Sequence, residues 1–164
     1  SNGDITRITL WDLYASNQYI YLAAYFRSGS SNRTLKQVYR HYSSNVSSPT
    51  TVSYNSSAAG RLASNPSTRT TSSSGTHMGN NHELTVIRPN TSSSSGFQRQ
   101  TRGICKSWGY NTDSTTNYLE TTEAVMAPTT DDFVHTIRIM NSAGSFSSSY
   151  YFSGYYKVEK LEHF

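Results

Sequence analysis

The sequence FVHTIRIM, residues 133–140, has the clearest strand pattern of the chain. Phe133, Ile137 and Ile139 lie at alternating positions, with His135 at the position between the first two. The other face of this predicted strand is formed by Val134, Thr136, Arg138 and Met140. A period of two is typical of a β-strand that buries one face. The stretch therefore predicts a half-buried strand, and with it a fold built from sheets.

Further strands are predicted before and after this stretch, because β-branched and aromatic runs are bounded by clusters of Ser, Asn and Gly. Residues 17–27 are apolar on both faces, which predicts a strand buried between two layers. Gly154 predicts a bulge or a close approach of another strand. The other predicted strands cover residues 4–14, 34–42, 50–54, 59–63, 82–88, 97–108 (ending at Gly109), 118–126 and 150–161.

The number of strands decides the predicted architecture. Eight to ten strands joined by short turns, with little or no helix, predict an all-β antiparallel β-sandwich. We favour a jelly-roll-like arrangement over an immunoglobulin sandwich, because no pair of Cys residues flanks a Trp. The length of 164 residues fits one domain that covers residues 1–164.

The composition is unusual for a folded domain. Ser, Thr, Asn and Gly make up 71 of the 164 residues, whereas Leu, Ile, Val and Phe together number 28. So few aliphatic residues with a high net charge would indicate disorder. The net charge is only +4, and 13 Tyr supply additional apolar surface. We therefore expect a folded domain with a thin, aromatic-rich core that gains part of its stability from neighbouring chains.

Several classes of protein are excluded by pattern. No apolar run reaches the roughly 18 residues of a membrane span, and the first residues, SNGD, do not form a signal segment. The basic residues are scattered, whereas a nucleic-acid interface usually gathers them on one face. A single cysteine, Cys105, cannot form a disulfide within the chain. We expect no contact with membranes or nucleic acid.

Catalytic and metal-binding patterns are also missing. His77 and His82 do not have the spacing of a zinc-binding helix, and we interpret both as polar loop residues. Glu120 and Glu123 are three residues apart, so in a strand they face opposite sides. We predict that Cys105 is buried and inert. The expectation is a protein that is not an enzyme, with no metal and no cofactor.

Tyrosines are the main positive feature, because Tyr offers rigid contact area with a polar tip. An alternative is that about half of them fill the core. The candidate binding residues are Tyr110, Tyr118, Tyr150, Tyr151, Tyr155 and Tyr156.

The order of these features resembles a group of small bacteriophage virion proteins and tail-fibre end domains. The Tyr-rich strand pair of residues 17–42 and the sequence HELTVIRPNTSSSSGF, residues 82–97, carry part of the resemblance. The closing sequence FVHTIRIMNSAGSFSSSYYFSGYYKVEKL, residues 133–161, is similar to their strand, Ser-Gly loop and final aromatic strand. The resemblance implies a jelly-roll-like β-sandwich in a symmetric, often trimeric, assembly on a virion. It implies no catalytic residues.

Two functions remain open at this point. The first is a capsid decoration (cement) protein on the outer surface of the head, which binds the major capsid protein or another virion protein. It is favoured because strand-like sequence already begins at Ile5, whereas a tail adhesin usually carries an attachment segment before its domain. Such a protein would use a sheet edge and the terminal arms, residues 1–7 and 159–164. The alternative is a tail-fibre tip that recognises a host surface glycan or protein through the loops of residues 65–81 and 90–96.

Overall fold

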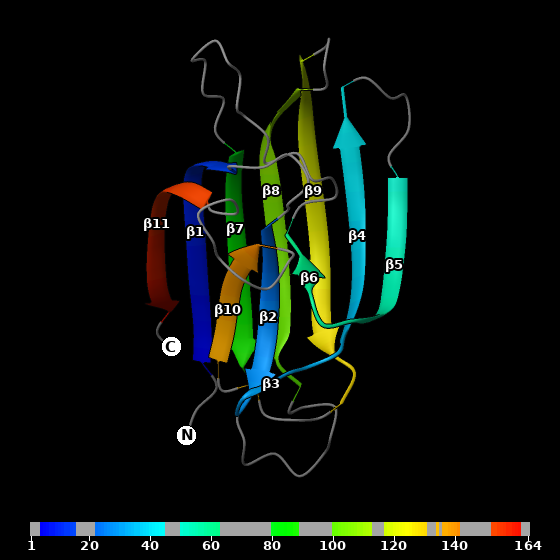
Figure 1. Cartoon of the computed structure of the whole chain (residues 1–164), viewed down its shortest axis with the longest axis vertical. Coiled ribbons are helices and arrows are strands. Elements are labelled where there is room, and N and C mark those ends of the chain that lie inside the picture. The colour runs from blue at the N-terminus through cyan, green and yellow to red at the C-terminus, as the bar shows by residue number, and fades with distance from the viewer. Residues whose placement is uncertain are drawn as a thin grey trace.

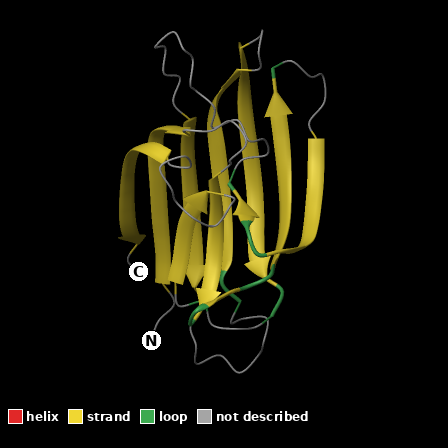
Figure 2. Cartoon of the chain, in the orientation of Figure 1, coloured by secondary structure: helices red, strands yellow, loops and turns green. Residues whose placement is uncertain are grey.

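The computed structural model describes residues 4–15, 22–44, 50–62, 80–88, 100–112, 117–130, 134, 136–141 and 152–161. Within these residues two antiparallel sheets pack face to face (Figure 1). Their regular elements are all strands, with no helix among them (Figure 2). Nine strands have six or more residues and two have only two residues. The predicted all-β antiparallel sandwich is confirmed.

The larger sheet has seven strands in the order β11-β1-β7-β8-β9-β4-β5. Ile5 in its second strand lies opposite Leu161 in its first, so the described ends of the chain lie at the same end of one sheet edge (Figure 1). The strands are β11 (Phe152–Leu161), β1 (Asp4–Ala15), β7 (Asn80–Arg88), β8 (Arg102–Thr112), β9 (Asn117–Pro128), β4 (Leu35–Ser43) and β5 (Thr50–Ser57).

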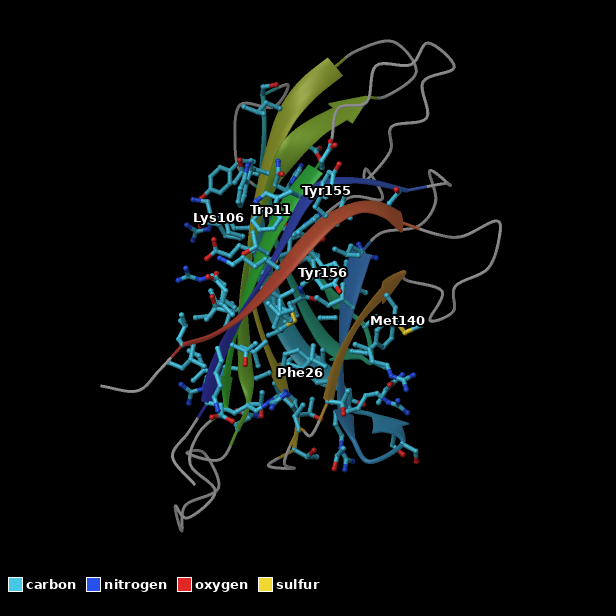
Figure 3. All side chains as sticks on the ribbon, turned by 90° about the vertical axis from the view of Figure 1, so that its left-hand side faces the viewer. Trp11, Phe26, Lys106, Met140, Tyr155 and Tyr156 are labelled. Atoms are coloured by element: carbon cyan, nitrogen blue, oxygen red, sulfur yellow. The ribbon has the colours of Figure 1, made fainter. Side chains whose placement is uncertain are left out.

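The smaller sheet covers one face of the larger sheet, which we call the inner face; the opposite face is the outer face (Figure 3). Its central strand is β2 (Leu22–Ser28), with β10 (Thr136–Asn141) on one side. The short strands β3 (Ser31–Asn32) and β6 (Gly60–Arg61) pair with its other side. All side chains from Leu22 to Phe26 are buried, which confirms the predicted strand with two apolar faces over its described part.

Side-chain alternation divides the larger sheet into a buried and an exposed face. On β8, Gly103, Cys105 and Ser107 are buried, whereas the even-numbered side chains from Arg102 to Trp108 are exposed. The core cluster is Leu10, Leu13, Leu22, Ala24, Phe26, Leu35, Tyr39, Leu62, Leu84, Val86, Cys105, Ala124, Met126 and Val134. Within the described residues this cluster is mainly aliphatic, and Phe26 and Tyr39 are its aromatic members.

Several strand boundaries differ from the prediction, and those of β8 and β10 have a clear physical reason. Strand β8 begins at Arg102 and continues through Gly109 to Thr112, so this glycine does not end the strand. It pairs with Glu120 of β9, and a paired neighbour strand supports continued extension. Strand β10 begins at Thr136, later than predicted, because Val134 turns into the core outside the strand.

Gly154 confirms the predicted bulge and close approach. The pairing of β11 with β1 shifts register between Trp11 and Tyr14, directly opposite this glycine. Its φ is 150°, and a Cβ there would lie 2.7 Å from the carbonyl oxygen of Trp11 and 2.8 Å from that of Asp12. These two oxygens belong to the main chain of β1, which cannot move away as a flexible side chain could. Glycine is therefore the residue that fits this position.

We expect Gly154→Ala to lower the free energy of unfolding by about 2–3 kcal/mol, because it adds a backbone clash to an unfavourable φ. Urea denaturation measures the change. Gly29→Ala is the matched control, since Gly29 also has a positive φ but no atom lies within 4 Å of the added Cβ. The control is expected to lose only about 1 kcal/mol. Equal losses would show that the close approach has no energetic role.

Candidate functional site

Both sheets end on the same side of the sandwich, which we call the open side. Among the described strands, β10 pairs only with β2, and β11 pairs only with β1. Each therefore presents one row of main-chain N–H and C=O groups that these strands leave unpaired. Such edges are places where another extended chain can add to a sheet.

An apolar groove of about 360 Å³ lies on the open side, between β11 and the smaller sheet. Tyr156 and Val158 point from β11 into it and are 76% and 57% exposed, because the smaller sheet does not extend over them. Figure 3 shows Tyr156 between β11 and the smaller sheet. The lining residues are Ile8, Leu10, Leu13, Leu22, Ile139, Gly154, Tyr155, Tyr156 and Val158. This groove would accept apolar side chains of a partner.

The outer face of the larger sheet is a second exposed surface. Val38, Val125 and Ile104 lie opposite one another on β4, β9 and β8, and about half of each side chain is exposed. They line a shallow depression of about 380 Å³ together with charged neighbours, which include Lys106. Trp11 and Lys106 project from this same face in Figure 3. A flat surface of this kind suits contact with another extended surface.

A polar cluster lies buried in the core. The Nδ1 atom of His82 is 2.7 Å from Oγ of Ser107, and the Ser107 hydroxyl donates a hydrogen bond to the carbonyl oxygen of Leu62. The proton on this histidine is therefore on Nδ1, which donates to Ser107. The Nε2 atom has no hydrogen-bond partner among the described residues. Burial lowers the pKa of His82 to about 4, so the ring is neutral at pH 7. The prediction of a polar loop histidine is wrong for His82.

Cys105 belongs to the same cluster, with Sγ 3.5 Å from Oγ of Ser107. Burial raises the pKa of its thiol to about 12, so the nucleophilic thiolate is not formed at neutral pH. The prediction of a buried, inert cysteine is confirmed. A Ser–His pair can form a nucleophile and base, but Ser107 and His82 are both closed off from solvent and the serine hydroxyl is directed at a main-chain carbonyl. The cluster is structural.

The other titratable side chains of the described residues do not gather at one site. Glu120 lies on the inner side of β9 with its carboxylate 3.3 Å from Nε2 of His41, whereas Glu123 is on the outer face, so the two glutamates face opposite sides as predicted. No group of three or more His, Cys, Asp or Glu that could hold a metal occurs among the described residues. In the same part of the chain, no helix is long and apolar enough to cross a bilayer.

Two of the six predicted tyrosines, Tyr155 and Tyr156, have described side chains. Tyr155 and Tyr156 are both exposed but lie on opposite faces of β11. The main chains of Tyr110 and Tyr118 are neighbours on β8 and β9, and their side chains are outside the described part. Tyr150 and Tyr151 lie outside the described residues altogether.

The structure describes part of the predicted terminal arms, whereas most of the predicted binding loops lie outside the described residues. Residues 4–7 and 159–161 are not arms, since they form paired parts of β1 and β11, with Nζ of Lys160 3.1 Å from the Asp4 carboxylate. That part of the prediction is wrong because the two ends of the chain pair with each other. Residues 1–3 and 162–164, the loop of residues 65–79 and that of residues 90–96 lie outside the described residues.

Comparisons of this chain with protein-family models, with curated proteins and with solved structures find no match.

Proposed function

We propose that this protein is a structural protein of a bacteriophage particle, which decorates the head shell and attaches to it through the open side. The observation that supports this proposal most is the apolar groove between two unpaired strand edges. Strand edges bind extended protein segments through main-chain hydrogen bonds, and pockets beside them select alternate side chains. The protein is proposed to act by binding, without a catalytic step.

The proposed occupant of the open side is an extended segment of the major capsid protein. The sequence of β10, TIRIMN, carries one charged residue and no proline, so it has little of the protection that isolated edge strands usually carry. A segment added to β10 would place every second side chain over Tyr156 and Val158. These exposed side chains would then be removed from water, which stabilises the complex.

Val158→Asp tests this attachment, because a carboxylate in the groove must be desolvated when a partner binds. We expect binding to head shells stripped of the protein to weaken at least tenfold in co-sedimentation, with the far-UV circular dichroism unchanged. Val125→Asp is the matched control: it is also a valine, 53% exposed, but on the outer face. Equal weakening by both variants would contradict attachment through the open side.

Two further measurements test the assignment itself. Immunogold electron microscopy of the virus particles should place the label on the heads; label at tail tips would overturn the decoration function. Sedimentation velocity tests whether the free protein is a trimer. A trimer that Val158→Asp dissociates would mean that the open side joins copies of this chain, and attachment to the shell by that side would be wrong.

A further inference from the structure

Six neighbouring strands place outward side chains in one line across the outer face, which we call the aromatic row. The pairs Trp11–Tyr155, Asn81–Trp108, Trp108–Thr121 and Tyr42–Thr121 are direct cross-strand neighbours. The bulge in β1 brings Trp11 beside Asn81, and the main-chain N–H of Asp12 donates to Oδ1 of Asn81 at 3.3 Å. In order from β11 to β4, the row is Tyr155, Trp11, Asn81, Trp108, Thr121 and Tyr42.

From β1 to β4 the rings repeat at every second strand, with Trp11 on β1, Trp108 on β8 and Tyr42 on β4. Neighbouring strands lie about 4.8 Å apart, so Trp11 and Trp108 are separated by about 10 Å, as are Trp108 and Tyr42. These three side chains are each 38% exposed. Small polar residues, Asn81 and Thr121, stand between them. A flat line of large exposed rings at a regular interval is uncommon on a protein surface and indicates a binding site.

The row alternates stacking surfaces with hydrogen-bonding groups. The faces of aromatic rings carry negative partial charge and attract the C–H groups of a sugar ring, while side-chain amides and hydroxyls bond its hydroxyl groups. An extended β-1,4-linked glycan turns each sugar over relative to the last, so equivalent faces recur once per disaccharide. That repeat is close to the distance of two strands.

A second row of outward side chains, which we call the charged row, lies two residues further along each of the same strands. Opposite charges alternate there, and the guanidinium of Arg40 also has a hydrogen bond with Tyr42, which raises its pKa. The residues are Lys157, Thr9, Glu83, Lys106, Glu123 and Arg40. Single-stranded nucleic acid needs a consistently positive groove beside its stacking rings. Alternating signs fit a neutral ligand with many hydroxyl groups.

We propose that the aromatic row binds a neutral, extended β-1,4-linked polysaccharide that lies across the strands. Trp11, Trp108 and Tyr42 stack on alternate sugars, and Asn81, Thr121 and the charged row bond the hydroxyls between them. This site is on the face opposite the groove, so the proposal does not depend on attachment to a shell.

The chain contains only two tryptophans, and both belong to the aromatic row. Tryptophan emission of the intact protein therefore reports the site directly. We expect hexasaccharides of β-1,4-linked glucose or N-acetylglucosamine to shift the emission saturably, and the trisaccharides to bind at least tenfold more weakly. Maltohexaose, which is α-1,4-linked and coiled, is expected to cause no saturable shift. No saturable shift with either β-linked hexasaccharide up to about 20 mM would overturn the proposal, because three stacked rings should give at least a low-millimolar affinity.

Trp108→Ala should weaken hexasaccharide binding at least tenfold by isothermal titration calorimetry. Ile104→Ala, an exposed outward residue of the same strand outside the row, should leave it unchanged. Unfolding curves of both variants establish that each is folded. Equal affinity of Trp108→Ala and the wild type would overturn the proposal. So would loss of shell binding in Trp108→Ala with no glycan binding by the wild type, since the row would then contact protein.

Discussion

Phe26→Ala is expected to lower the free energy of unfolding by about 3–5 kcal/mol, the usual cost of removing a fully buried ring. Phe26 has no exposed surface and lies at the centre of the sandwich, on β2. Its ring packs over Gly103 of β8, where a Cβ would come within 2.9 Å of both Cζ of Phe26 and Cγ of Met126. The absence of a side chain at Gly103 makes the space that the ring fills. A domain with few large core residues has little other packing to compensate.

Labelling of the Cys105 thiol measures this loss in native buffer, because a fully buried thiol reacts only when the structure opens. We expect labelling of Phe26→Ala to be at least a hundredfold faster than that of the wild type. Ile104→Ala, next to Gly103 but directed outward, should change the free energy of unfolding by less than about 1 kcal/mol.

A double-mutant cycle tests the pairing of ring and glycine. Gly103→Ala alone should destabilise the protein, and its cost should fall by more than about 1 kcal/mol when Phe26 is already Leu. Strictly additive effects would show that the ring and the glycine do not share one space.

The strands were predictable because their signal is local. Residues 82–88 alternate with a period of two, and residues 34–42 contain an apolar and aromatic run. The structure places strands at Asn80–Arg88 and Leu35–Ser43. Because side chains alternate between the two faces of a strand, the sequence also predicts that Glu120 and Glu123 lie on opposite faces of the sheet. The number of strands and the lack of helix among the described elements follow from the same local rule.

Burial of His82 was missed although a signal for it existed. In HELTVIR, His82 is in phase with Leu84 and Val86, which are both buried. Histidine has only an intermediate preference for the interior, so its residue type alone does not indicate that it is buried. The position of a residue in the alternating pattern determines whether its side chain is buried, because a strand cannot turn one side chain outward without shifting all of them.

The aromatic row could not be predicted from local pattern. Trp11, Trp108 and Tyr42 are distant in the sequence, and they align only because β1, β7, β8, β9 and β4 pair in that order and register. Register depends on contacts between strands and on the bulge opposite Gly154. The sequence-based selection of Tyr155 and Tyr156 found two exposed rings, and neighbours in a strand face opposite sides of the sheet. Which of the two rings lies on the outer face depends on where the smaller sheet packs, and the local pattern does not contain that information.

Acidification from pH 7 to pH 5 is expected to lower the free energy of unfolding by about 2 kcal/mol through His82 alone. In the folded protein, burial holds the pKa of this ring at about 4, below the ordinary value of 6.5 that an unfolded chain would have. Between these two values the unfolded chain binds more protons than the folded protein, so stability falls as the pH falls. The stability is fully present above about pH 6.5, and the loss approaches about 3 kcal/mol near pH 4.

Urea unfolding at pH 7, 6 and 5 measures this dependence. His82→Leu should remove most of the drop, because it deletes the proton-binding group while Ser107 keeps its hydrogen bond to the carbonyl of Leu62. Val86→Ala, a buried neighbour on the same face of β7, should lower the stability by a similar amount at each pH and keep the drop. An unchanged pH dependence in His82→Leu would mean that other groups cause the acid sensitivity. The effect should be large because Nε2 has no hydrogen-bond partner among the described residues, so a proton bound there would have no acceptor. The backbone of Leu62 offsets the burial of the charged ring only in part.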